Sequence, residues 1–213
     1  MTQRREQRPA SVPALRRGDA LDVAELPSYG FSHRSLMWWG NAGMMTIEGV
    51  AFGFTIVIYF YLRSIAQTWP DGGSVPELRW GTLNLVLILA SAVPNHYAGR
   101  KALDRDVRGV RIGLIGASLF GLALCGVRAL ELTALNVRWD DSAYGSIVWM
   151  LIGLHTFNLV TDFGDTLVLT AVMYTKPLEG KRFVDIAENT GYWWFVVLTW
   201  IPIYAVIYWG ARV

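Results

Sequence analysis

Hydrophobic residues in this chain gather into five long runs, and the segments between them hold most of the charged residues. A transmembrane helix needs about 20 mostly apolar residues, because each residue advances it by about 1.5 Å through a hydrocarbon core of about 30 Å. The pattern therefore predicts an all-α, polytopic membrane bundle. The five predicted transmembrane helices span residues 36–62, 83–98, 112–130, 144–174 and 192–209.

Two prolines interrupt the predicted helices. Pro94 lies in the second run, which is also the shortest, and Pro202 lies in the fifth. We expect each proline to kink its helix, with the freed carbonyl satisfied by a neighbouring helix. The predicted transmembrane domain covers residues 36–213. Residues 1–35 are rich in arginine and lack the apolar core of a cleavable signal, so they predict a flexible cytoplasmic tail.

Composition agrees with a membrane protein. Hydrophobic residues make up 53% of the chain and charged residues 17%, against about 25% charged residues in soluble domains. The net charge of +2 is too small to indicate a nucleic-acid partner. The single cysteine, Cys125, cannot form an intrachain disulfide and is interpreted as an inert buried thiol.

The distribution of Lys and Arg predicts the orientation in the membrane. The tail and the alternate loops after it hold 14 of these residues on one side, and the remaining loops hold 4 on the other. Because cytoplasmic loops carry the excess of positive charge, the N-terminus is predicted to be cytoplasmic and the C-terminus periplasmic.

Glu48 lies near the middle of the first predicted span, where a charge is costly. Asn41, Thr55 and Tyr59 fall on the same helical face, so this polar stripe must face protein, lipid head groups or water. One interpretation of Glu48 is a proton-linked or lipid-binding carboxylate. The other is a protonated side chain that hydrogen-bonds a neighbouring helix.

The fourth predicted span carries a second polar stripe. Its members fall within an arc of about 80° at 100° per residue, which allows either a proton relay or metal site, or a buried face that packs against a partner. With only one histidine, the stripe is poor in transition-metal ligands. The stripe consists of His155, Asn158, Asp162 and Asp165, with Tyr144 and Thr166 close to the same line.

Arg128 and Glu131 lie one turn apart at the end of the third span and predict an ion pair near the membrane interface. Elsewhere the sequence has no haem-attachment motif and no glycine-rich phosphate loop. From the residues alone, the chain is a membrane protein with buried carboxylates and no evident active site. A stand-alone proton-linked transporter that uses the Glu48 and Asp162 stripes is one function that fits.

Several segments resemble subunit III of the haem–copper terminal oxidases, in the order in which that family has them. The first resembles the helix that bears the family's buried glutamate, the fourth its G-[LF]-H helix, and the last its closing segment. These segments are Trp38–Ser64, Leu78–Ala98, Gly121–Leu132, Tyr144–Val160 and Lys181–Gly210. The resemblance covers about residues 36–210 and implies the short, five-helix form of the family.

This resemblance implies a subunit without a redox centre of its own. Haem and copper are expected in partner subunits, and this chain would bind subunit I directly, subunit II and further small subunits, together with structural phospholipids in a cleft. It would support proton uptake and sustained O₂ reduction in a bacterial plasma membrane. The family's buried glutamate corresponds to Glu48, its cleft histidine to His155, and the glutamate before its third loop to Glu131.

Lys176, Lys181 and Arg182 are expected to contact lipid head groups on the cytoplasmic side. The chain also departs from the family at two sites. Asn158 stands where a second histidine is common, and Tyr192–Val197 lacks the family's closing His and Asp. These departures leave open an accessory subunit of a nitric oxide reductase. The choice between cytochrome c and quinol as electron donor belongs to other subunits.

Overall fold

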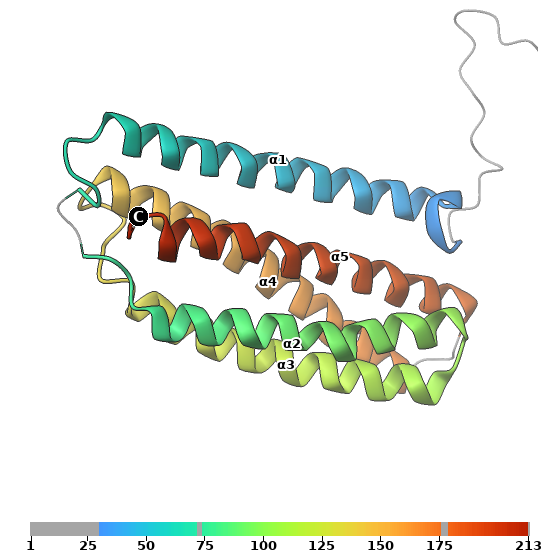
Figure 1. Ribbon diagram of the computed structural model, residues 1–213. Coiled ribbons are helices and arrows are strands. Elements are labelled where there is room, and N and C mark those ends of the chain that lie inside the picture. Colours follow the sequence, from blue (N-terminus) through green and yellow to red (C-terminus); the bar gives the residue numbers. More distant parts are fainter. Residues whose placement is uncertain (1–29, 72–73, 176–178, 213) are drawn as a thin grey trace, which may run out of the picture.

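The computed structural model describes residues 30–71, 74–175 and 179–212, and its regular secondary structure there is entirely helical. Five long helices run antiparallel in chain order, so the two ends of the helical domain lie at opposite ends of the bundle (Figure 1). They are α1 (Leu36–Ile65), α2 (Leu78–Leu103), α3 (Val107–Thr133), α4 (Ala143–Thr175) and α5 (Gly180–Tyr204). A short 3₁₀ turn, η1 (Ser32–Arg34), precedes α1, and a π-helical turn, η2 (Ala205–Trp209), follows α5.

Side-chain caps begin α1, α3 and α4; at α4, the Ser142 hydroxyl accepts the Gly145 N–H at 3.1 Å. The Ser35 hydroxyl accepts the Trp38 N–H at 3.2 Å at the start of α1, and the Asp106 carboxylate accepts the Gly109 N–H at 3.1 Å at the start of α3. Each cap satisfies one of the backbone donors that the first turn leaves free. The Asp106 cap lies in the tight corner between α2 and α3, so these two helices form a close hairpin.

The helices do not contribute equally to the bundle. α5 packs on three long helices, α1, α2 and α4. α1 makes extensive contacts with just two of the described long helices, α4 and α5. About 56% of the most apolar stretch of α5 and η2 is buried, against 17% of that of α1. The first helix is therefore attached along one side only, as Figure 1 shows.

The bundle has apolar side chains outside and many polar ones inside. Ile47, Phe54 and Val93 are among its large exposed hydrophobic residues. The buried polar residues come from α1 to α5 and include Asn84, Ser91, Asn95, Arg128, Glu131, His155, Asn158 and Asp162. This arrangement suits a lipid environment, in which apolar faces meet acyl chains and polar groups find partners between helices.

Four helices are long and apolar enough to cross a membrane: α1, α3, α4, and α5 with η2. The chain is thus a multi-pass membrane protein. α2 has 26 residues but falls outside this set, because polar residues such as Asn84, Asn95 and His96 lower the hydropathy of its central stretch.

The helices are longer than the predicted spans. α5 begins at Gly180 rather than at residue 192, and its additional turns carry Asp185, Glu188 and Asn189. Hydropathy marks the part of a helix that suits hydrocarbon and misses polar helical turns. Helix α2 continues through Pro94, and α5 continues through Pro202 before it widens into η2. The predicted tail lies outside the described residues up to position 29.

Candidate functional site: a carboxylate cleft and a buried charge network

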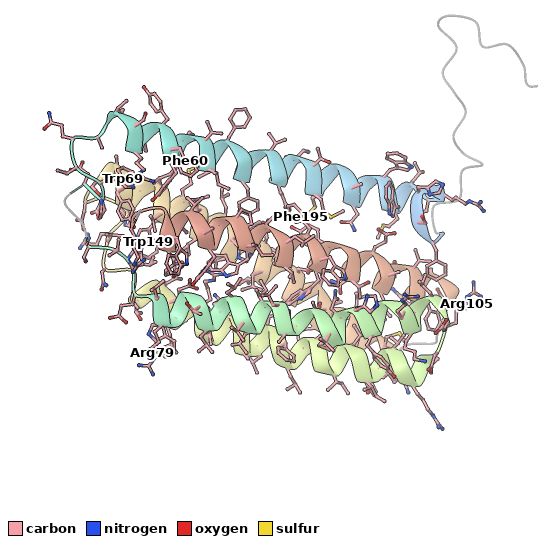
Figure 2. The ribbon with its side chains drawn as sticks, viewed as in Figure 1. Phe60, Trp69, Arg79, Arg105, Trp149 and Phe195 are labelled. Atoms are coloured by element: carbon pink, nitrogen blue, oxygen red, sulfur yellow. The ribbon has the colours of Figure 1, made fainter. Side chains whose placement is uncertain are left out.

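Glu48 joins three helices through its carboxylate. The Tyr192 hydroxyl of α5 donates to Oε2 of Glu48 at 2.6 Å, and the Asn158 amide of α4 donates to the same oxygen at 3.3 Å. Glu48 itself is half-buried, next to the point where Phe195 projects from α5 toward α1 (Figure 2). Both of its hydrogen-bond donors are neutral groups.

Asp162 lies one turn beyond Asn158 on α4 and is buried. The Asn189 amide of α5 donates to its Oδ1 at 2.7 Å, and the Thr166 hydroxyl donates to the Asn189 carbonyl oxygen at 3.1 Å. Within the described part of the chain, Oδ2 of Asp162 has no hydrogen-bond partner. Asp162 thus combines deep burial with an unused acceptor.

An open cleft of about 800 Å³ lies between α1, α4 and α5, next to Asp162. Apolar side chains such as Leu36, Met37 and Leu169 form part of its wall. No Lys, Arg or His is among its described lining residues, and the cleft carries several carboxylates. These are Asp162, Asp165, Asp185 and Glu188. We call this feature, together with the adjacent Glu48, the carboxylate cleft.

The polar stripe of α1 contacts protein groups at several positions, and at Asn41 it also lines the carboxylate cleft. The Asn41 amide donates to Oε2 of Glu188 at 3.2 Å, and Tyr59 is fully buried and accepts the Trp69 indole N–H at 3.1 Å. Thr55 is buried as well, and its hydroxyl donates to the Ala51 carbonyl within the same helix. Protein therefore surrounds the two buried members of the stripe, Thr55 and Tyr59.

A second polar cluster surrounds Arg128, which is almost completely buried. Its Nη1 forms an ion pair with Oε2 of Glu131 at 2.9 Å, as the spacing predicts, and both side chains are only 1% exposed. Its Nη2 lies 3.1 Å from Nδ1 of His155. A guanidinium only donates, so Nδ1 must accept; Nε2 of His155 therefore carries the proton and donates to the Val196 carbonyl at 3.0 Å.

Further groups complete this cluster, which we call the Arg128 network. The Arg128 guanidinium lies 3.9 Å from the centre of the Trp200 ring, and the carboxylate of Glu131 accepts from Tyr208 at 2.5 Å and from Asn84 at 2.6 Å. The network thereby connects α2, α3, α4, α5 and η2. Its cation and its anion are both enclosed by protein.

The predicted stripe of α4 is divided between the two clusters. His155 belongs to the Arg128 network, whereas Asn158 and Asp162 face Glu48 and α5. Asp165 is exposed at the edge of the cleft, although its sequence position placed it in line with the buried members. Phe52 packs beside His155, with ring centres 6.3 Å apart, on the helix that carries Glu48. Among the described residues, no three His, Cys, Asp or Glu side chains are grouped so as to hold a metal ion.

The three predicted head-group contacts differ in what the structure shows. Lys181 is exposed and lies 2.6 Å from Glu179, and the hydrogen bond between them holds the pKa of the Glu179 carboxyl below its usual range. Arg182 lies 3.6 Å from Asp185, which lines the cleft. Lys176 lies outside the described residues. The two described cations thus already have carboxylate neighbours.

Sequence reasoning missed most of the partners in both clusters. Tyr192, Asn189 and Glu188 stood outside or at the edge of the fifth predicted span, and Asn84 was one polar residue in an apolar run. The position of Asn84, a polar residue inside a predicted span, was the one sequence feature that could have identified it as a member of a site. Nothing in the sequence alone pairs it with Glu131.

Comparison with known proteins gives the same family as the ordered segments. The cytochrome c oxidase subunit III family matches residues 42–212. Cytochrome c oxidase subunit 3 of Thermostichus vulcanus is 24% identical over 165 residues, which cover 76% of this chain and 81% of that protein. The proteins of the same name from Pylaiella littoralis and Triticum aestivum are 22% and 24% identical over 174 residues, or 78% of this chain. The match spans 64% and 66% of their lengths. Since the family match covers most of its length, the chain belongs to the cytochrome c oxidase subunit III family.

Proposed function

We propose that the chain is the non-catalytic subunit III of a haem–copper respiratory oxidase. In this proposal it binds subunit I directly, associates with subunit II and further small subunits, and resides in a bacterial plasma membrane. Haem and copper belong to the partner subunits. All five long helices cross the membrane, with the N-terminus cytoplasmic and the C-terminus periplasmic.

The observation that carries the functional part is the position of Glu48. Among the described residues, its carboxylate accepts from Tyr192 and Asn158, both neutral, and Tyr192 also lines the cleft with its further carboxylates and apolar walls. A protonatable group held in this way can exchange a proton with the cleft, and the apolar walls can hold acyl chains. Glu48, Asp162 and Asp165 therefore serve proton uptake or lipid binding, whereas His155 and Glu131 act through the Arg128 network. Lys181 and Arg182, with Lys176, remain proposed head-group contacts.

Purification of the chain from its native membrane tests the complex. An oxidase that contains haem and copper should co-purify, and its absorption spectrum identifies the haem. Co-purification of a nitric oxide reductase would favour the accessory-subunit alternative. A colourless homo-oligomer would favour a transporter and contradict the proposal.

Glu48→Gln in the purified complex tests the carboxylate itself. We expect the variant complex to assemble normally and to reduce O₂ at a normal initial rate. It should complete about half as many turnovers or fewer before it is inactivated, or should retain less phospholipid. Glu77→Gln is the matched control, because Glu77 is exposed before α2 and lies outside the cleft. Equal turnover survival and equal lipid content in both variants would show that Glu48 has no such role.

A further inference from the structure

A second pocket, of about 310 Å³, lies at the same end of the bundle as the carboxylate cleft, where α1 begins. It is formed by α2, the start of α5 and the turn before α1. Its polar lining differs from that of the cleft, because no carboxylate is among its described lining residues. His96, Arg100, Trp38 and Trp194 are the side chains that carry nitrogen donors there. We call it the Arg100 pocket.

The donors of this pocket are mostly free to bind a ligand. Nε of Arg100 lies 3.5 Å from Nε2 of His96, which accepts, and this contact leaves both terminal nitrogens of the guanidinium available. The indole N–H groups of Trp38 and Trp194 make no hydrogen bond within the described part of the chain. A set of donors without an acidic partner favours an anion.

Arg100 differs from two of its basic neighbours, Lys101 and Arg111. Lys101 lies 3.3 Å from Asp106, and Arg111 donates to the Met173 carbonyl at 2.7 Å at the end of α4. No ion pair of the described residues includes Arg100. Its positive charge is therefore available to a ligand, whereas those of Lys101 and Arg111 already have protein partners.

Apolar surface continues from the pocket along the helices. On α2, Leu89 and Val93 lie on nearly the same face as His96 and are exposed, and on α5, Leu198 and Ile201 extend the line of Trp194 and are exposed as well. Tryptophan favours the level of the lipid head groups, and basic pockets between transmembrane helices bind anionic head groups. The pocket and this surface together match a head group followed by acyl chains.

We propose that the Arg100 pocket binds the phosphodiester head group of an anionic glycerophospholipid, whose acyl chains lie along the exposed apolar faces of α2 and α5. The guanidinium of Arg100 contacts the phosphate oxygens, and the indoles of Trp38 and Trp194 donate at the level of the ester groups. This site is separate from the carboxylate cleft. It requires neither an oxidase partner nor a role for Glu48.

Native mass spectrometry of the purified full-length chain in detergent, with phosphatidylglycerol as the probe, tests the proposal. Loss of one charge-assisted contact predicts about tenfold weaker retention of phosphatidylglycerol in Arg100→Gln. Arg100→Lys should retain most of the lipid, because it keeps the charge. Arg105→Gln is the matched control: Arg105 is exposed at the same end of the bundle and does not line the pocket (Figure 2).

Three results would overturn the proposal. Equal retention of phosphatidylglycerol by Arg100→Gln and the unaltered chain would remove Arg100 from the site. Equal retention of phosphatidylcholine by the unaltered chain would show that the pocket does not select an anionic head group. Displacement of the lipid by excess inorganic phosphate would identify a free anion rather than a lipid as the ligand. Far-UV circular dichroism confirms that each variant is folded, which is expected because Arg100 is exposed.

Discussion

The two polar clusters that share α4 compensate charge in different ways. In the Arg128 network, a guanidinium is paired with a carboxylate and hydrogen-bonded to a neutral imidazole, and four helices and η2 enclose all three groups. In the carboxylate cleft, the described donors to Glu48 and Asp162 are all neutral, and open space lies beside Asp162 and Tyr192. The first cluster holds the helices together, and the second leaves protonatable groups accessible.

This difference teaches how one helix can carry both structural and exchangeable polar groups inside a membrane. A buried ion pair is stable only while both partners are present, because a single buried charge has no compensation. A carboxylate bound by neutral donors beside an open cleft does not depend on a counter-ion in this way. The same substitution is therefore expected to have unequal effects in the two clusters.

The largest expected effect is that of Glu131→Gln. The change leaves the Arg128 guanidinium buried without an anion, which costs about 3–5 kcal/mol of the free energy of unfolding. Unfolding of the purified chain by denaturant in detergent micelles, followed by tryptophan fluorescence, measures the loss. The double variant Arg128→Met, Glu131→Gln should recover much of it. A loss of less than about 1 kcal/mol would mean that the pair is not enclosed as described.

His155→Phe should have the next largest effect. The substitution removes the acceptor of an Arg128 N–H, and a buried polar group left without a partner costs about 1–3 kcal/mol. The Val196 carbonyl loses one donor but keeps the Thr199 hydroxyl at 3.2 Å. The same unfolding measurement applies. His96→Phe is the control, because His96 is exposed, and it should change the free energy of unfolding by less than about 0.5 kcal/mol. Equal effects of the two variants would refute the assigned role of His155.

Glu48→Gln should destabilise the chain far less than Glu131→Gln. The Tyr192 hydroxyl can still donate to the amide oxygen, and no buried cation is left without a partner, so we expect a change below about 1 kcal/mol. This pair of identical substitutions compares the clusters directly. If Glu48→Gln reduced the free energy of unfolding as much as Glu131→Gln, the cleft would have to be counted as a second structural network.

The smallest effect concerns Asp106, which is half-buried and lies outside both clusters. Its hydrogen bond from Gly109 N–H and its neighbour Lys101 lower the pKa of its carboxyl. Because its pKa is lower in the folded chain, Asp106 stabilises the fold above its unfolded pKa of about 3.9, and this contribution is lost as the pH falls through the folded value. Asn keeps the cap without the charge. Asp106→Asn should thus be slightly less stable near neutral pH and equal to the unaltered chain in acid. A stability difference that does not vary with pH would exclude the charge as its source.

Sequence patterns predicted the features that depend on residues close together along the chain. The apolar runs located all five helices, and the spacing of Arg128 and Glu131 predicted their ion pair. The polar first turns of α5 were missed, because hydropathy reports suitability for hydrocarbon rather than helical conformation. Membrane orientation and the span formed by α2 stay predictions.

The composition of the sites was harder to predict than the helices. Glu48 could be identified because a charged side chain within an apolar run is energetically unfavourable. Its partners could not, because Asn158 and Tyr192 lie 110 and 144 residues away along the chain. The helical arc of α4 correctly indicated that most of its polar residues are buried. An arc of 80° is nevertheless wide enough to face two neighbouring helices, so it could not show that His155 and Asp162 belong to different clusters.

The one-sided attachment of α1 has a consequence for biogenesis. Chains are made from the N-terminus, so α1 is the first of the five helices to leave the ribosome, yet its packing partners α4 and α5 are the last. The hairpin of α2 and α3 can pair as soon as it is complete, whereas α1 has to wait in the membrane until the rest of the chain follows. During that interval Glu48 lacks the donors Asn158 and Tyr192. A ribosome that stalls before α5 therefore leaves Glu48 without its Tyr192 donor and α1 without one of its two packing partners.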